Sequence, residues 1–112
     1  MDLERAPMGN KELLNSVSTE AVKILESLNR MLKSDLSGTV EHRMTAQQLL
    51  DFLDTRIDRG PVGLGGVMAR FSTRLGVALV GETQKPGSLS DGKINEIIAL
   101  IDRETAALSP GQ

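Results

Sequence analysis

The chain has 112 residues, a formal net charge of −2, and a composition poor in aromatic residues, with two Phe and no Cys, Trp or Tyr. This length predicts a single domain with a small core. The lack of cysteine excludes disulfides and thiolate metal sites, and one histidine leaves few routes to acid–base catalysis. We therefore expect a non-enzymatic protein with no catalytic residues, no cofactor and no metal.

The N-terminal third contains a polar arm followed by the most periodic segment. Residues 1–10 include Pro7 and Gly9, which predict an extended arm. Residues 11–33 predict a helix whose apolar residues alternate steps of three and four, the spacing of a helix–helix interface. The residues of this apolar face are Leu14, Val17, Ala21, Ile24, Leu28 and Met31. A break near 15–19 is the alternative, because Ser and Thr there are poor helix formers.

A second helix is predicted over residues 45–59. Thr45 and Gln48 have the spacing of an N-terminal capping box, and Leu49 and Leu53 belong to the apolar stripe that follows. Gly60 stands where a left-handed residue commonly ends a helix, and the proline after it forbids continuation.

The segment 64–80 predicts a third helix that is apolar on more than one side. Besides its main apolar arc, Gly65, Ala69 and Thr73 form a row of small residues that would let another backbone approach closely. A helix apolar on two sides is central or lies at an interface. A buried strand over residues 75–80 is the alternative.

A last helix is predicted over residues 90–108, with Ser88 or Ser90 as its N-cap. Its predicted apolar stripe is Ile94, Ile97, Ile98, Ile101, Thr105 and Leu108. Four helices joined by short loops predict an all-α, four-helix bundle-like single domain over residues 1–112.

Two features carry functional hypotheses. The apolar face of residues 14–31 is either the core face of one chain or a surface through which copies associate, and we weigh these readings about evenly. A small chain poor in aromatics gains much by burying surface between subunits, which favours a homo-oligomer.

The second feature is a cationic segment, residues 59–81, which holds Arg59, Arg70 and Arg74 and no acidic residue. These arginines are candidate contacts for an anion or for an acidic partner surface. Nucleic acid is disfavoured as a partner, because stacking aromatics and base-reading side chains are both lacking.

Three weaker candidates are better explained structurally. His42 has no companion ligands for a zinc site. The carboxylates of Asp51, Asp54 and Asp58 fit a solvated helix face, and the glycine-rich segment 60–66 lacks the Lys-Ser/Thr of a phosphate-binding loop. No apolar run approaches the length that spans a membrane.

We therefore expect a protein that binds itself or another protein, in the cytoplasm or in a virion. Phage assembly proteins and bacterial accessory factors offer an analogy. The alternatives are a DNA-associated helical module that uses residues 59–81 and a small regulator or inhibitor of a partner protein. An enzyme with an acidic metal site ranks last.

Overall fold

The computed structural model describes the backbone of residues 10–84 and 87–108, with their side chains except at 10–15 and 40. Every regular element within these ranges is helical, which confirms the predicted all-α class. The elements are α1 (Asn10–Ser37), the 3₁₀ turn η2 (Val40–His42), α2 (Ala46–Asp58), α3 (Leu64–Val67), α4 (Ala69–Ala78) and α5 (Asp91–Leu108). The predicted arm over residues 1–10 lies outside the described residues, except that Asn10 begins α1.

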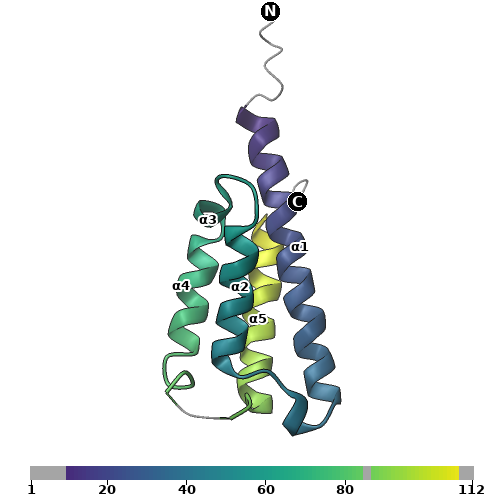
Figure 1. Cartoon of the computed structure of the whole chain (residues 1–112). Helices are drawn as coiled ribbons and strands as arrows, with labels where there is room; N and C mark the ends of the chain where they lie inside the picture. The colour runs from purple at the N-terminus through teal and green to yellow at the C-terminus, as the bar shows by residue number, and fades with distance from the viewer. Residues whose placement is uncertain (1–9, 85–86, 109–112) are drawn as a thin grey trace, which may run out of the picture.

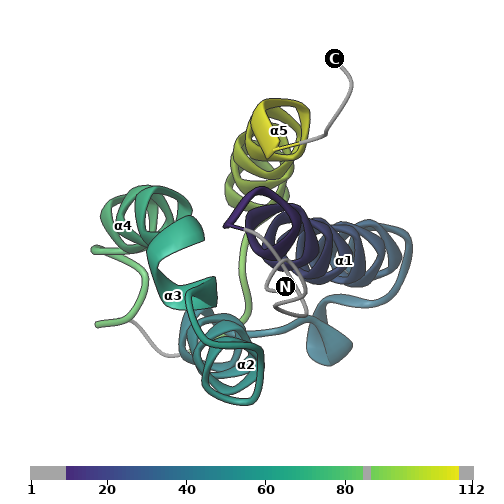
Figure 2. The same cartoon turned by 90° about the horizontal axis from the view of Figure 1, so that it is seen from above.

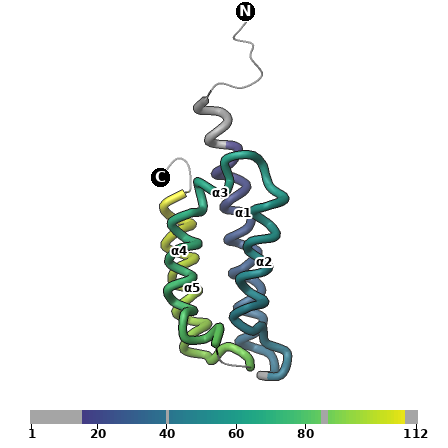
Figure 3. The backbone as a smooth tube through the Cα atoms, turned by 60° about the vertical axis from the view of Figure 1, so that its left-hand side comes forward, coloured from purple at the N-terminus to yellow at the C-terminus, as the bar shows by residue number. Residues whose placement is uncertain are grey.

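The long helices run antiparallel to their neighbours along the chain (Figure 1). Viewed along their axes, α1, α2, α4 and α5 stand at four corners, with the short α3 between α2 and α4 (Figure 2). The turn η2 lies at one end of the bundle and α3 lies at the other (Figure 3). The most extensive packing is between α1 and α5, and α4 also packs on α5.

Aliphatic side chains and Phe71, the largest of the buried residues, fill the space between the helices. Every long helix contributes to this core, and so do Leu64 of α3 and Leu89 of the connection before α5. The core is therefore continuous from one end of the bundle to the other, and α5 has a buried stripe of three isoleucines.

Helix α1 differs from its prediction in two respects. It is unbroken across residues 15–19, because Val17 and Ala21 lie on one buried stripe and their packing outweighs the weak helix propensity of the neighbouring Ser and Thr. It also continues past residue 33 to Ser37, because Leu36 packs against the core one turn after Leu32. The hydroxyl of Ser37 donates to the carbonyls of Lys33 and Ser34, both at 3.2 Å, and so satisfies the last turn.

The start of α2 confirms the predicted capping box. The Gln48 amide donates to Thr45 Oγ1 at 3.1 Å, and the Thr45 amide donates to Gln48 Oε1 at 3.0 Å. The predicted left-handed Gly60 is wrong, since Gly63, with φ 97°, has that backbone instead. Arg59 ends the helix in a right-handed conformation, and the chain reverses later, just before α3. A Cβ at Gly60 would meet Cδ2 of the fully buried Leu64 and would lie 3.3 Å from the carbonyl oxygen of Arg56, so space at this position is tight.

The predicted helix over residues 64–80 is split and shorter than expected. Met68, with φ −96° and ψ 4°, separates α3 from α4, and its fully buried side chain anchors the junction. The paired glycines before it are poor helix formers, which lowers the cost of the break. Leu79 caps α4, and turns follow it, with the Glu82 amide donating to the Leu79 carbonyl at 2.9 Å. The alternative strand over residues 75–80 is wrong, because residues 75–78 are helical.

Helix α5 begins as predicted beside Ser90. The Lys93 amide donates to Ser90 Oγ at 3.2 Å, which is the bond of an N-cap. Ser88, the other predicted N-cap, does not cap α5; its hydroxyl donates to the Arg43 carbonyl at 3.4 Å.

Arg43 joins three segments at the η2 end of the bundle, and we call this group the Arg43 junction (Asp35, Arg43, Met44, Leu89 and Asp91). The Arg43 guanidinium, with 8% of its side chain exposed, pairs with the Asp91 carboxylate. It also donates to the carbonyls of Asp35 at 3.1 Å and Leu89 at 3.4 Å. The Met44 amide donates to Asp35 Oδ2 at 2.9 Å, and the Leu89 amide donates to the Met44 carbonyl at 3.1 Å. These bonds tie the end of α1 to the starts of α2 and α5.

Candidate functional site

The apolar face predicted on the first helix belongs to the core of the chain. Val17, Ala21, Ile24 and Leu28 are each 0–2% exposed. Met31 is half-buried at the edge of this face, and the side chain of Leu14 lies outside the described residues. The buried members have no surface left to offer a second copy, so these residues are part of the core of one chain.

The three predicted arginines do not form one cluster. Arg59 is exposed at the C-terminal end of α2, whereas Arg70 and Arg74 lie one turn apart on α4. Arg70 is engaged in an ion pair with Glu104 of α5. Arg74 is exposed and takes part in no ion pair among the described residues. Of the three, Arg74 is the cation that lines a pocket.

The Arg70–Glu104 pair is two-pronged. Arg70 Nε donates to Glu104 Oε1 at 3.3 Å, and Nη2 donates to Oε2 at 3.2 Å. Glu104 has 3% of its side chain exposed, whereas Arg70 has 54%. Glu104 lies three residues after Ile101 and therefore follows the apolar spacing of α5. The apolar stripe predicted from the sequence continued through Thr105 instead, so Glu104 was not predicted to be buried.

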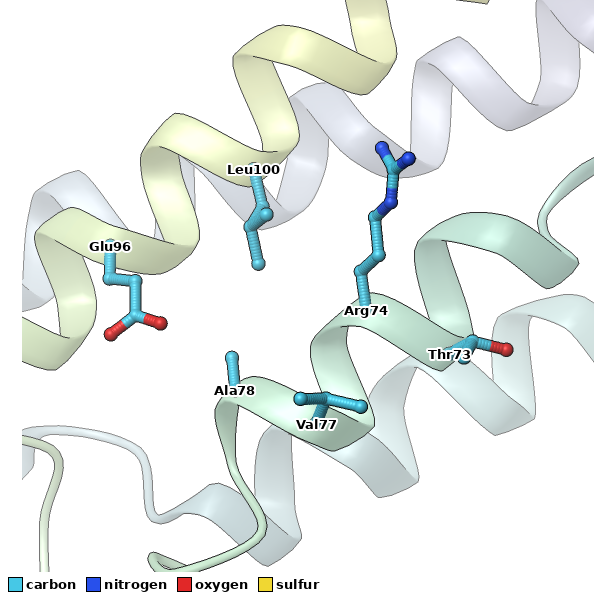
Figure 4. Close-up of a pocket in the computed structure, with 6 residues that line it drawn as sticks. All are labelled: Thr73, Arg74, Val77, Ala78, Glu96 and Leu100. Atoms are coloured by element: carbon cyan, nitrogen blue, oxygen red, sulfur yellow. The ribbon is translucent and has the colours of Figure 1, made fainter.

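A groove between α4 and α5 is the candidate functional site. Its volume is about 300 Å³, and its lining residues are Thr73, Arg74, Val77, Ala78, Glu96 and Leu100. Leu100 points from α5 into the space between the two helices, while Arg74 and Glu96 extend into it from opposite helices (Figure 4). The floor is apolar, and the only charged groups among its lining residues are one cation and one anion.

Polar contacts close the groove at both ends. The Arg70–Glu104 pair lies one turn before Arg74 along α4. At the other end, Lys93 Nζ donates to the carbonyl of Ala78 at 2.9 Å and to Glu96 Oε1 at 2.8 Å. A cation at the C-terminal end of α4 also suits the helix dipole. These cross-helix bonds hold α4 and α5 at a defined spacing, so the groove is preformed.

The outer side of α4 and the turn after it expose two valines. Val77 is 70% exposed, and Val80, just after the helix, is 65% exposed. The small residues predicted to form a second row, Gly65, Ala69 and Thr73, are all exposed. The segment is therefore apolar on two sides, as predicted, and its second side faces outward.

The weaker sequence candidates do not converge on a site. His42 is exposed, with its Nδ1 2.6 Å from Thr39 Oγ1. Asp51 accepts a bond from Gln47 at 3.0 Å, and Asp54 and Asp58 are exposed. The described residues contain no group of three His, Cys, Asp or Glu side chains that could hold a metal ion. The glycine-rich segment forms the approach to α3 and most of that helix.

The comparisons with known proteins add no relative to this picture. No family, curated protein or solved structure matches the chain. Among the helices of the described residues, none combines the length and apolar character needed to cross a bilayer.

Proposed function

We propose that the chain is a non-enzymatic protein that acts by binding another protein chain, with self-association as the favoured form. The observation that carries the proposal is the groove between α4 and α5, bordered by the exposed Val77. An exposed apolar surface rimmed by charged residues is typical of protein-binding sites. A preformed groove also lowers the ordering cost of binding.

This proposal moves the predicted interface from α1 to the α4–α5 face. Burial of the α1 face inside the chain supports the change, because a surface must be accessible before it can bind. An assembly or accessory protein of a phage or bacterium, in the cytoplasm or a virion, is the setting suggested by analogy.

A protein partner fits this surface better than nucleic acid. Phosphate binding at physiological salt requires several cations that are free to replace counterions. Arg70 is paired with Glu104, and Arg59 lies on a different helix from Arg74. The groove lining contains no aromatic side chain on which a base could stack.

Light scattering coupled to size exclusion, from micromolar to millimolar protein, tests the favoured form. We expect a species heavier than the 12.1 kDa monomer and a lower mass for Val77→Asp. Val62→Asp is the matched control, because Val62 is 95% exposed but lies before α3, outside the groove lining. A parent protein that stays monomeric throughout, or two variants with equal effects, would contradict the proposal.

A further inference from the structure

We infer that the α4–α5 groove is a two-fold interface between two copies of this chain, in which Arg74 of each copy faces Glu96 of the other. The inference rests on the proposed function and names the partner and its orientation. A two-fold interface brings one surface patch against itself, so the patch must be complementary to its own rotated image. The groove meets this requirement in charge, because its lining contains one cation, Arg74, and one anion, Glu96.

The centre of the patch is apolar. The half-buried Leu100 lies between the two charged lining residues, and the half-buried Ala78 and the exposed Val77 lie beside it along α4. A two-fold axis through this centre would bring Val77 of one copy beside Val77 of the second. Each valine would then cover the half-buried Leu100 floor of the opposing groove, which removes apolar surface from water.

The charges on either side of this centre have opposite signs. Arg74 extends from α4 and Glu96 extends from α5, with Leu100 between them (Figure 4). Rotation about the central axis exchanges the two sides, so each guanidinium meets a carboxylate. The alternative two-fold axis, which runs along the line from Arg74 to Glu96, would place Arg74 against Arg74 and Glu96 against Glu96, so like charges disfavour it.

Glu96 remains available for this contact although it is near Lys93. Lys93 Nζ contacts only Oε1 of the carboxylate and also binds the Ala78 carbonyl. The Lys93 side chain is 20% exposed, whereas that of Glu96 is 51% exposed. The carboxylate is therefore the group that this side of the groove presents outward.

The surroundings of the groove can enlarge the interface. A stable dimer buries about 800 Å² on each partner, which is more than one small groove provides. Ala99 on α5, next to the groove residue Leu100, is exposed and small, so it allows a second chain to approach closely. Val80 is 65% exposed beside the C-terminal end of α4 and adds apolar area.

Charge reversal tests the pairing directly. Arg74→Glu alone would oppose two carboxylates at both contacts, and Glu96→Arg alone would oppose two guanidinium groups. We expect each variant to weaken its own dimer at least about tenfold. An equimolar mixture of the two variants restores opposite charges at both contacts of a mixed dimer, so it should recover the parent mass. Circular dichroism of each variant checks that it remains helical.

A cysteine cross-link provides a second measurement that does not depend on charge. The chain has no cysteine, so Val77→Cys would carry a single thiol. Near a two-fold axis this residue lies beside its own copy and should form an intermolecular disulfide under mild oxidation, which requires Cα atoms within about 7 Å. Val62→Cys, which is at least as exposed, should remain largely uncross-linked.

The outcomes separate this inference from the proposed function. A parent dimer that is insensitive to both reversals, or single variants that dissociate but do not recover on mixing, would overturn the two-fold pairing and leave self-association standing. Equal cross-linking of both cysteine variants would do the same. A monomeric parent would overturn self-association itself. Dimerisation of the mixture together with selective cross-linking at position 77 supports the inference.

Discussion

Replacement of Arg70 by Met is expected to destabilise the fold by isolating a buried carboxylate. Glu104 has 3% of its side chain exposed, so without Arg70 it keeps little hydration and loses both hydrogen bonds from the guanidinium. Breaking a buried ion pair costs about 3–5 kcal/mol. Arg70 is itself 54% exposed, so water can reach part of the vacated space. We therefore expect a loss of about 2 kcal/mol.

Urea and thermal unfolding followed by circular dichroism measure this loss. For a chain of this size, a loss of about 2 kcal/mol lowers Tm by roughly 10 °C. The double variant Arg70→Met/Glu104→Met should return to within about 1 kcal/mol of the parent, because an apolar pair no longer buries an unpaired charge. Arg103→Met, an exposed arginine of α5, is the control and should change stability by less than about 0.5 kcal/mol.

Two results would refute this reasoning. The first is an Arg70→Met variant within about 0.5 kcal/mol of the parent, which would mean that the pair contributes little more than a surface ion pair. The second is a double variant as unstable as the single one, which would place the cost in lost packing instead of the isolated charge of Glu104.

Two further predictions concern helix ends, and the same unfolding measurements check both. Thr45→Ala should cost about 1 kcal/mol through loss of the N-cap bond. Thr55→Ala in the last turn of the same helix should be neutral or slightly stabilising, and equal effects of the two changes would contradict the role of the cap. Gly60→Ala should cost about 1–3 kcal/mol, because its Cβ would press on the buried Leu64. Gly66→Ala is the control and should cause no loss of stability, because an added Cβ there meets nothing within 4 Å. A Gly60→Ala variant as stable as the parent would show that Gly60 is not crowded by Leu64.

The helix starts could be predicted from sequence because their determinants are local. Thr45 and Gln48 are three residues apart and bond to each other, and Ser90 bonds to the amide of Lys93. Capping chemistry of this kind depends on a few neighbouring residues and needs no knowledge of the rest of the chain.

The helix ends and the break at Met68 depend on distant contacts. Leu36 extends α1 only because it reaches the core, and Met68 interrupts a helical pattern while its side chain stays fully buried. Gly60 illustrates the same dependence, since it is required by the position of Leu64 instead of by its own backbone conformation.

The candidate site was predictable only in part. Helical spacing shows that Ile24 and Leu28 face a partner helix, but the same spacing arises whether that helix is in the same chain or another one. The small residues of the 64–80 segment are exposed, and the approach of another backbone to them stays a prediction. The groove itself could not be predicted, because its lining comes from α4 and α5, whose register depends on tertiary packing.

The Arg43 junction has a consequence for how the two connections at its end of the bundle exchange amide hydrogens. The Leu89 amide donates to the Met44 carbonyl, in a segment far away along the chain, so it should exchange only when the start of α5 detaches from the rest. The amides of Glu82 and Thr83 bond only to the nearby Leu79 carbonyl. That turn can open alone, so the two connections should exchange by different routes: the turn after α4 by local fraying, and the junction by a cooperative opening that includes the start of α5.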